Sequence, residues 1–204
     1  IIGIGSSGRL AAYHAQARQL DSLEIAYIDY HPQIDAVVME DKTLTIEHLE
    51  NTQERRQSWE ELEFTWKDYY DYIVSCSMII LIGGINTHKD LDLAKRIVDL
   101  CEINRVLSIC ISYQEMPIFG LSKAVLAETD QNTYLPNIDA FVAISSKKIA
   151  QRLGAEWTPQ NAVIAVNDMM VYTVRGLTDP ITKTSFCRTN LDDTRSVISK
   201  MGPA

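Results

Sequence analysis

The sequence has few of the residues that build metal sites or disulfide frameworks. Four cysteines and four histidines are present among 204 residues, and no set of them has metal-ligand spacing. The cysteines lie far apart, mostly within apolar stretches, and form no CxxC pair. We therefore expect reduced, buried thiols in a cytoplasmic protein. They are Cys76, Cys101, Cys110 and Cys187.

Positive charge and long apolar runs are also scarce. The chain has 19 Lys and Arg against 27 Asp and Glu, which gives a formal net charge of −8. Nucleic acids and anionic membranes are bound through clustered Lys and Arg, so neither is an expected partner. No apolar run approaches the roughly 18 residues of a membrane span. Small molecules and other proteins are the expected partners.

Two common catalytic signatures are missing. The sequence contains neither a GxSxG nucleophile elbow nor a GxxxxGK[ST] phosphate loop. We therefore expect neither the chemistry of an α/β-hydrolase nor that of a P-loop NTPase.

What the sequence does contain is an alternation of short β-branched runs with longer helical patterns. This alternation predicts β/α units and a parallel sheet whose strands are buried on both faces. A hydrophobic content of 46% provides one sizeable core, and we expect a single domain over residues 1–204. The expected strands are 1–4, 24–29, 77–82, 105–112 and 138–144, and the expected shorter helices are 8–20, 89–102 and 147–153.

The longest expected helix covers residues 159–175. Pro159 suits its first turn, and Gly176 is placed to be the left-handed residue beyond its end. A loop and one more amphipathic helix are expected over residues 188–200.

The first candidate phosphate loop is Ile-Ile-Gly-Ile-Gly-Ser-Ser-Gly-Arg at residues 1–9. Gly3, Gly5 and Gly8 form a GxGxxG pattern between an expected strand and an expected helix. Glycines permit a tight turn and close backbone approach, and the free N–H groups at a helix start attract phosphate. The alternative is a plain turn that uses glycine for conformation alone.

Asp29 extends this pattern toward a dinucleotide site. It lies 21 residues after Gly8, near the end of the second expected strand, where a dinucleotide-binding fold carries its ribose-binding acid. Taken alone, these residues favour an NAD(P)-dependent oxidoreductase that uses Gly3, Gly5, Gly8 and Asp29.

Three central segments resemble, in order, parts of the tubulin/FtsZ family. The strand expected at 77–82, followed by Gly83-Gly84 and a helix, resembles the family's strand and glycine-rich phosphate loop. Residues 106–120, which end in Met-Pro-Ile-Phe-Gly, resemble the next strand and the family's proline- and phenylalanine-containing loop. Residues 137–148 are similar to the following strand and its ribose-facing turn, where Ser146 lies.

The end of the chain carries the most telling part of the resemblance. Residues 174–182, Val-Arg-Gly-Leu-Thr-Asp-Pro-Ile-Thr, lead into Asn190-Leu-Asp-Asp193-Thr-Arg. This register resembles the end of the core helix, the catalytic loop and the next helix of FtsZ. The likeness spans nearly the whole chain in order.

The resemblance implies a doubly wound, mostly parallel sheet with helices on both faces, similar to a Rossmann fold. It also implies a divergent protein that binds GTP or GDP, with Mg²⁺ as an accompanying ion, and that self-associates or docks to a filament. The chain ends about where the family's second domain begins, so that domain is expected to be absent. Two alternatives stay open: the NAD(P)-dependent oxidoreductase, and a non-hydrolysing binding module of the same fold.

The resemblance assigns catalytic roles near the end of the chain. In the family, acidic residues of the catalytic loop reach the nucleotide on the neighbouring subunit of a filament. Asp193 falls on the second of these positions, and Asn190 stands at the first, with Asp192 nearby as a substitute acid. By the alternative interpretation, Asn190 caps the helix that begins there and Asp193 is a first-turn acid favoured by the helix dipole.

Base recognition is assigned to the long helix. Asn167 matches the position from which the family hydrogen-bonds the guanine edge, and an amide offers both a donor and an acceptor. Asn167 could equally be an exposed polar residue of the helix. Val163 stands near where an aromatic ring would stack on the base, which would weaken base binding.

The second phosphate loop departs furthest from the family. FtsZ has a nearly continuous Gly/Thr loop, whereas this chain reads Gly-Gly-Ile-Asn-Thr-His-Lys over residues 83–89. Ile85 and His88 bring side chains where close backbone approach is needed, while Thr87 keeps a hydroxyl and Lys89 a charge. We therefore expect weak or lost hydrolysis. The expected nucleotide-binding residues are Gly5, Ser6, Ser7, Gly8, Gly83, Gly84, Asn86, Thr87, Ser146 and Asn167.

Overall fold

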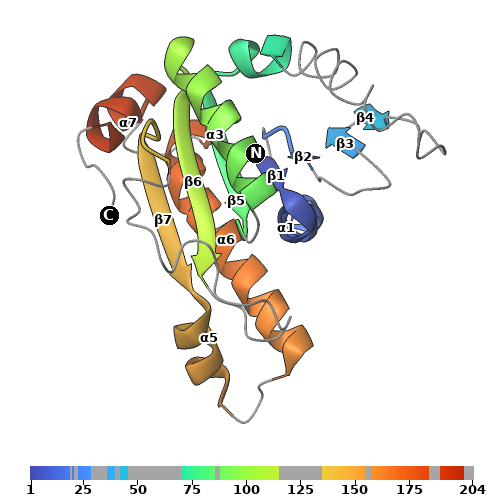
Figure 1. Ribbon diagram of the computed structural model, residues 1–204. Helices are drawn as coiled ribbons and strands as arrows, with labels where there is room; N and C mark the ends of the chain where they lie inside the picture. The colour runs from blue at the N-terminus through green and yellow to red at the C-terminus, as the bar shows by residue number, and fades with distance from the viewer. Residues whose placement is uncertain are drawn as a thin grey trace, which may run out of the picture.

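A seven-stranded sheet covered by helices forms the centre of the molecule (Figure 1). The computed structural model describes residues 1–18, 20, 23–28, 36–39, 42–45, 70–85, 88–114, 135–154, 158–183 and 189–199. The strands are β1 (Ile2–Ile4), β2 (Ala26–Ile28), β3 (Ala36–Met39), β4 (Lys42–Thr45), β5 (Met78–Gly83), β6 (Leu107–Gln114) and β7 (Ala140–Ser145). The helices are α1 (Gly5–Ala17), α3 (His88–Ile103), α5 (Ser146–Leu153), α6 (Pro159–Thr182) and α7 (Leu191–Ile198).

The sheet order is β4-β3-β2-β1-β5-β6-β7. Five neighbouring strands in this order, β2, β1, β5, β6 and β7, are parallel. Each of these five strands overlaps a strand that the β-branched runs predicted. The mostly parallel α/β fold class is thereby confirmed.

An antiparallel edge was missed by the sequence analysis. The strands β3 and β4 pair with each other, and β3 pairs with β2, in antiparallel register. Each contains four residues. Their conformation depends on pairing with a neighbouring strand, which no local residue pattern contains.

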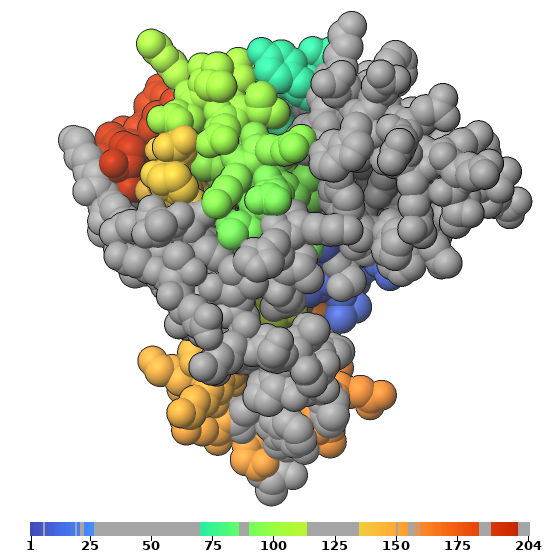
Figure 2. Space-filling model, in the orientation of Figure 1, coloured from blue at the N-terminus to red at the C-terminus, as the bar shows by residue number. Residues whose placement is uncertain are grey.

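Helices cover both faces of the sheet, which explains why its central strands are apolar on both sides. On one face, Ala94, Ile97 and Cys101 of α3 pack in a cluster with Leu81 and Cys110. Figure 1 places α3 on the opposite side of the sheet from α6, and in Figure 2 α3 (green) forms part of the molecular surface.

A second cluster lies on the other face. It joins Ala12 and Ala15 of α1 and Val166, Met170 and Val174 of α6 to alternate residues of β5 and β6. The sheet is therefore doubly wound, with α1 and α6 packed against each other over one face.

The core helix is longer than its sequence predicted, and Gly176 was placed wrongly. The helix α6 continues through Gly176 and Pro180 to Thr182, and Gly176 is not among the glycines with positive φ. Thr178 is 1% exposed, and burial of this residue outweighs the weak helix preference of glycine. Pro180 lacks a backbone N–H, and the helix ends two residues later.

The remaining helices agree closely with the sequence prediction. The helix α6 begins at Pro159 after Thr158, whose Oγ1 accepts a hydrogen bond from the Asn161 N–H at 3.1 Å.

Within the described part of the chain, no helix is both long and apolar enough to cross a membrane.

Candidate nucleotide site

The strand order places a topological switch point between the carboxyl ends of β1 and β5. The chain passes from β1 to β2 on one side, whereas β5 lies on the other side of β1 and is followed by β6. The following helices, α1 and α3, pack on opposite faces of the sheet. Parallel α/β sheets bind ligands at such a switch point, outside the carboxyl ends of the strands. The two predicted phosphate loops follow β1 and β5, so they meet at this switch point.

The backbones of the two loops touch through glycine. A Cβ on Gly8 would lie 2.6 Å from the carbonyl carbon of Gly3 and 2.8 Å from the carbonyl oxygen of Ile82. A Cβ on Gly83, whose φ is +133°, would lie 2.7 Å from the Cα of Gly8. Side chains are excluded at these positions by close packing of β1, α1 and β5, with or without a ligand. The glycine pattern therefore has a structural cause in addition to any phosphate role.

Ser7 joins the two loops. Its Oγ accepts a hydrogen bond from the Gly84 N–H at 2.9 Å and donates one to the Gly84 carbonyl oxygen at 3.0 Å. Both hydrogen bonds connect residues 77 positions apart. The Gly84 N–H, one of the donors that a phosphate would need, is therefore already used by Ser7.

An acidic side chain lies at the same place. Asp90 belongs to the first turn of α3 and is 8% exposed. Gly5, at the start of α1, has φ +67°, and a Cβ there would lie 2.7 Å from Oδ1 of Asp90. Asp90 was not among the predicted site residues, although it follows a glycine loop closely in the sequence.

Asn167 lies on α6, the helix that packs against α1. It is 5% exposed. Among the described residues, the buried side-chain atoms without a hydrogen-bond partner are Ser112 Oγ and Arg195 Nε, and the Asn167 amide is not one of them. The alternative of an exposed polar residue is wrong for Asn167. Val163, four residues earlier, packs half-buried against the apolar cluster of this face.

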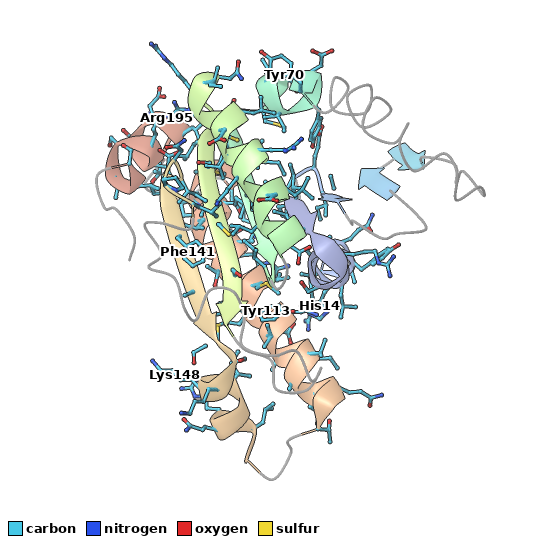
Figure 3. All side chains as sticks on the ribbon, in the orientation of Figure 1. His14, Tyr70, Tyr113, Phe141, Lys148 and Arg195 are labelled. Carbon is cyan, nitrogen blue, oxygen red and sulfur yellow. The ribbon has the colours of Figure 1, made fainter. Side chains whose placement is uncertain are left out.

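A charged cluster fixes α6 to α1 beside Asn167. Oδ1 of Asp168 accepts hydrogen bonds from Nε2 of His14 at 2.7 Å and from an Arg18 guanidinium nitrogen at 2.6 Å. Arg175 donates to the carbonyl oxygen of Arg18 at 2.6 Å. Figure 3 labels His14, which extends from α1 on the side where α6 passes. We call His14, Arg18 and Asp168 the α1–α6 clamp.

Two serines lie at the same edge of the sheet. Ser146 begins α5 directly after β7 and is 4% exposed. Ser112, near the carboxyl end of β6, is fully buried, and its Oγ has no hydrogen-bond partner among the described residues. Ser112 pairs with Gly83 in the sheet. Ser112 was predicted only as part of an apolar strand, and its position as a serine at the carboxyl end of that strand is the signal that could have identified it.

The two predicted catalytic residues lie elsewhere. The Asn190 side chain accepts a hydrogen bond from the Asp193 N–H at 2.7 Å, and Asp193 Oδ2 accepts one from the Asn190 N–H at 3.3 Å. This capping box begins α7, and both residues are exposed. A guanidinium nitrogen of Arg195 approaches the carbonyl oxygen of Ser77 at 3.5 Å, just before β5 begins.

The position of α7 separates the capping box from the glycine loops. Ser77 precedes β5, whereas Gly83 ends it, so α7 lies toward the amino ends of the strands. Figure 1 shows α7 at one end of the sheet and α5, which follows the carboxyl end of β7, at the other. Asn190 and Asp193 are therefore not at the switch point where Gly5, Gly8 and Gly83 lie.

Part of the predicted site lies outside the described residues. Asn86, Thr87 and Asp29 belong to this part, as do residues 115–120 and Cys187. Of the other cysteines, Cys101 and Cys110 are buried and Cys76 is half-buried, all as free thiols. Among the described residues, no group of three or more His, Cys, Asp or Glu could hold a metal ion. A Mg²⁺ ion commonly uses one or two protein carboxylates together with ligand phosphates, and Asp90 is the described carboxylate beside the glycine loops.

Comparisons with known proteins agree with the resemblance seen in the sequence. No family model matches the chain. It is 23% identical over 212 residues to the cell division protein FtsZ of Coxiella burnetii, covering 100% of this chain and 54% of that protein. It is 20% identical over 128 residues to the cell division protein FtsZ of Pseudomonas putida, covering 63% of this chain and 32% of that protein. The chain thus spans about half the length, or less, of these curated relatives.

Solved structures have the same fold. An FtsZ W319Y mutant from M. jannaschii superimposes with a TM-score of 0.70 at 13% identity, covering 99% of this chain and 62% of that one. CetZ from Methanosaeta thermophila gives a TM-score of 0.58 at 13% identity, with coverages of 98% and 59%. The fold is that of the α/β nucleotide-binding domain of tubulin and FtsZ. In sequence and in fold, the chain is similar to FtsZ proteins.

Proposed function

We propose that this chain binds a guanine nucleotide at the switch point between β1 and β5, with Asn167 against the base edge. The observation that carries the proposal is the burial of the Asn167 carboxamide residue, which is 5% exposed on the helix that packs against α1. A guanine edge presents N–H donors and a carbonyl acceptor, so a carboxamide can satisfy it and be satisfied by it. Phosphate would lie at the start of α1, where backbone N–H groups and the helix dipole favour an anion.

The proposed nucleotide is bound weakly and hydrolysed slowly or not at all. Phosphoryl transfer depends on positioning and on donors that stabilise charge on the γ-phosphate. Ser7 already occupies the Gly84 N–H, and Asp90 brings negative charge to the start of α1. Each lost donor costs on the order of 2.7–4 kcal/mol of transition-state stabilisation at other oxyanion sites.

Any hydrolysis would require a second subunit. Asp193 lies toward the amino ends of the strands, away from the glycine loops of its own chain. It could reach a nucleotide only in a neighbouring molecule, which supports self-association or docking to a filament as the chain's role. A solved FtsZ dimer from M. jannaschii has the same fold, with a TM-score of 0.70 over 99% of this chain.

Calorimetric titration tests base recognition. We expect GDP to bind more tightly than ADP, NAD or NADP, and Asn167→Asp to keep the preference for guanine, because a carboxylate accepts from the same base donors. Asn167→Ala should remove the preference. Asn161→Asp, the same chemical change at an exposed position of α6, is the matched control and should change nothing. ADP bound as tightly as GDP would show that Asn167 does not select the guanine base. Selective NAD(P) binding would support the oxidoreductase instead.

Dilution tests the shared site. Turnover of GTP per molecule should fall across a roughly hundredfold dilution, which corresponds to about 2.7 kcal/mol of association free energy. Single-turnover cleavage with Mg²⁺ at high protein concentration should be slow, and Asp193→Ala should reduce it further. Turnover that stays constant on dilution would contradict the shared site. A rate like that of an ordinary FtsZ, abolished by Asp193→Ala, would show that the altered phosphate loop is competent.

A further inference from the structure

Ser112 carries a buried hydroxyl group that has no hydrogen-bond partner. The residue is 0% exposed, and its Oγ is one of two buried side-chain atoms without a partner in the described part of the chain. A hydroxyl in this state destabilises the folded chain, because it has lost its hydrogen bonds to water and gained none in return. An unsatisfied group of this kind in a folded protein calls for an explanation.

Ser108, on the same strand, forms the hydrogen bonds that Ser112 lacks. It is 1% exposed, and Oδ2 of Asp139 accepts hydrogen bonds from its N–H at 2.8 Å and from its Oγ at 3.1 Å. The two serines are four residues apart on β6, so their side chains lie on the same face of the sheet. They differ in their place along the strand, because Ser112 lies near the carboxyl end, where parallel sheets bind ligands.

The neighbours of Ser112 place it beside the second glycine loop. Its partners in the sheet are Gly83, the last residue of β5, and Ala143 of β7. Cys110, two residues earlier, packs in the cluster that contains the apolar residues of α3, so the alternation of side chains puts Ser112 on the face that α3 covers. Neither glycine nor alanine has a polar side chain, so the adjacent strands offer the hydroxyl no side-chain partner.

We propose that Ser112 is a ligand-contacting residue whose hydroxyl forms a hydrogen bond with an oxygen atom of the bound nucleotide. The inference rests on the proposed nucleotide site and adds a residue of the next strand to it. A hydroxyl both donates and accepts, and the sugar hydroxyls and the phosphates of a nucleotide all present oxygen atoms. A hydrogen bond in an enclosed site is stronger than one at the surface. The Ser112 hydroxyl therefore lowers the stability of the unliganded chain and raises its affinity for the ligand.

The experiment compares Ser112→Ala with the wild-type chain in two measurements. Thermal melts without ligand report on stability, and calorimetric titrations with GDP, guanosine and inorganic pyrophosphate report on binding. Ser108→Ala is the matched control, because it removes the same hydroxyl from the same face of the same strand. Ser112→Cys is a second variant that removes the oxygen but keeps a similar size, to be used if Ser112→Ala fails to fold.

We expect Ser112→Ala to melt roughly 2–4 °C above the wild type, as a gain of about 1 kcal/mol would give in a chain of this size. Its affinity for GDP should fall about tenfold, because one enclosed hydrogen bond is lost. Ser108→Ala should melt below the wild type and bind GDP equally well. A loss of affinity shared by guanosine assigns the contact to the sugar, and a loss shared by pyrophosphate assigns it to the phosphates.

Equal GDP affinity in Ser112→Ala and the wild type would overturn the inference, as would an equal loss of affinity in Ser108→Ala. A lower melting temperature of Ser112→Ala would also overturn it, because the hydroxyl would then have a partner within the unliganded fold. If the wild type binds none of the three probes, the proposed nucleotide site itself fails, and Ser112 loses its ligand with it. That result differs from wild-type binding that persists unchanged in Ser112→Ala.

Discussion

The proposed phosphate end and the proposed base end of the candidate site are formed by different kinds of contact. At the phosphate end, the contacts are between backbones: Gly3, Gly8 and Gly83 touch, and Ser7 bridges the remaining gap to Gly84. At the base end, side chains form the contacts, with Asn167 buried beside the α1–α6 clamp. The first kind of contact tolerates almost no added atom, whereas the second depends on charge and hydrogen bonding.

This difference indicates where the chain can diverge without losing its fold. A base site made of side chains changes its chemistry by a single substitution while the helix around it stays in place. A phosphate site made of glycine backbone is also part of the core, so its packing is retained even when its chemistry is altered. In this chain the glycine packing is present together with an occupied Gly84 N–H. The packing of the loop therefore does not require a free Gly84 donor.

The largest effect is expected from adding one methyl group at the phosphate end. A Cβ on Gly8 would lie 2.6 Å from the Gly3 carbonyl carbon and 2.8 Å from the Ile82 carbonyl oxygen, both rigid backbone atoms. Gly8→Ala should therefore lower the free energy of unfolding by about 3 kcal/mol, at the upper end of overpacking effects. Urea unfolding followed by circular dichroism measures this change.

Gly176→Ala is the matched control for that substitution. A Cβ on Gly176 meets nothing within 4 Å, and the residue is helical within α6. The change should raise the free energy of unfolding by about 0.5–1 kcal/mol, because alanine is the better helix former. A loss of about 1 kcal/mol would instead mean that Gly176 has the left-handed conformation that the sequence first suggested. Equal changes in unfolding free energy at Gly8 and Gly176 would show that the close packing at Gly8 does not make it more sensitive to an added methyl group.

A smaller effect is expected from alkaline pH, which acts on the apolar layer between α3 and the sheet. Burial raises the pKa of the Cys101 thiol, and that of the Cys110 thiol, from 9.0 to about 12. The unfolded chain loses these protons near pH 9 while the folded chain retains them, so unfolding becomes more favourable as the pH rises above 9. Stability is complete below pH 9 and is lost as the pH rises toward 12, by about 1.4 kcal/mol per thiol at pH 10.

Urea midpoints between pH 8 and pH 10 measure this loss. Tyrosines in the unfolded chain are about half ionised at pH 10, and burial raises the pKa of Tyr72, so tyrosine adds a smaller loss at the upper end of this range. Cys110→Ala costs stability at every pH but should reduce the slope between pH 9 and pH 10. A slope that does not change in this variant would show that Cys110 ionises as readily in the folded chain as in the unfolded one.

At the base end, neutralising the clamp should have an effect near 1 kcal/mol. Asp168→Asn removes the charge that accepts from His14 and Arg18, in a site where the Asp168 side chain is 25% exposed. Partial exposure of Arg18 screens the pair, which keeps the expected loss of unfolding free energy to about 1 kcal/mol. The clamp lies next to Asn167, so GDP affinity should fall together with stability.

Asp179→Asn is the control on the same helix. Asp179 forms an exposed pair with Lys183 at 2.8 Å, of a kind worth at most a few tenths of a kcal/mol. It should leave both stability and GDP affinity close to those of the wild type. If Asp168→Asn lowers stability but leaves GDP affinity unchanged, the clamp holds the helices without positioning Asn167.

The smallest effect concerns α7, which lies away from both ends of the site. Asn190→Ala removes the side chain that accepts from the Asp193 N–H and should cost about 0.5–1 kcal/mol in unfolding free energy. Asn190→Ser should restore most of the loss, because serine is an equally good cap. A loss that serine does not restore would point to a role for Asn190 other than capping.

Much of the fold could be predicted from local sequence, because short-range residue patterns determine most of its strands and helices. Short β-branched runs gave the five parallel strands to within a few residues, and helical periodicity gave α1, α3 and α5. The antiparallel strands β3 and β4 were missed because pairing at a sheet edge, and not a hydrophobic period, defines them. The end of α6 was missed because burial of residues such as Thr178 outweighs a glycine signal.

The candidate site divides in the same way between sequence and tertiary structure. The sequence by itself determined the two glycine loops, the amide at Asn167 and the cap residues Asn190 and Asp193, since each depends on residue type and spacing. Only the tertiary structure decided that the loops touch through glycine and that Asn167 is buried, because packing between elements distant in sequence sets both. It also brought Asp90 beside Gly5, 85 positions earlier in the chain, and placed Asp193 at the other end of the sheet. These positions follow from the order of the strands, and strand order depends on contacts that no local pattern contains.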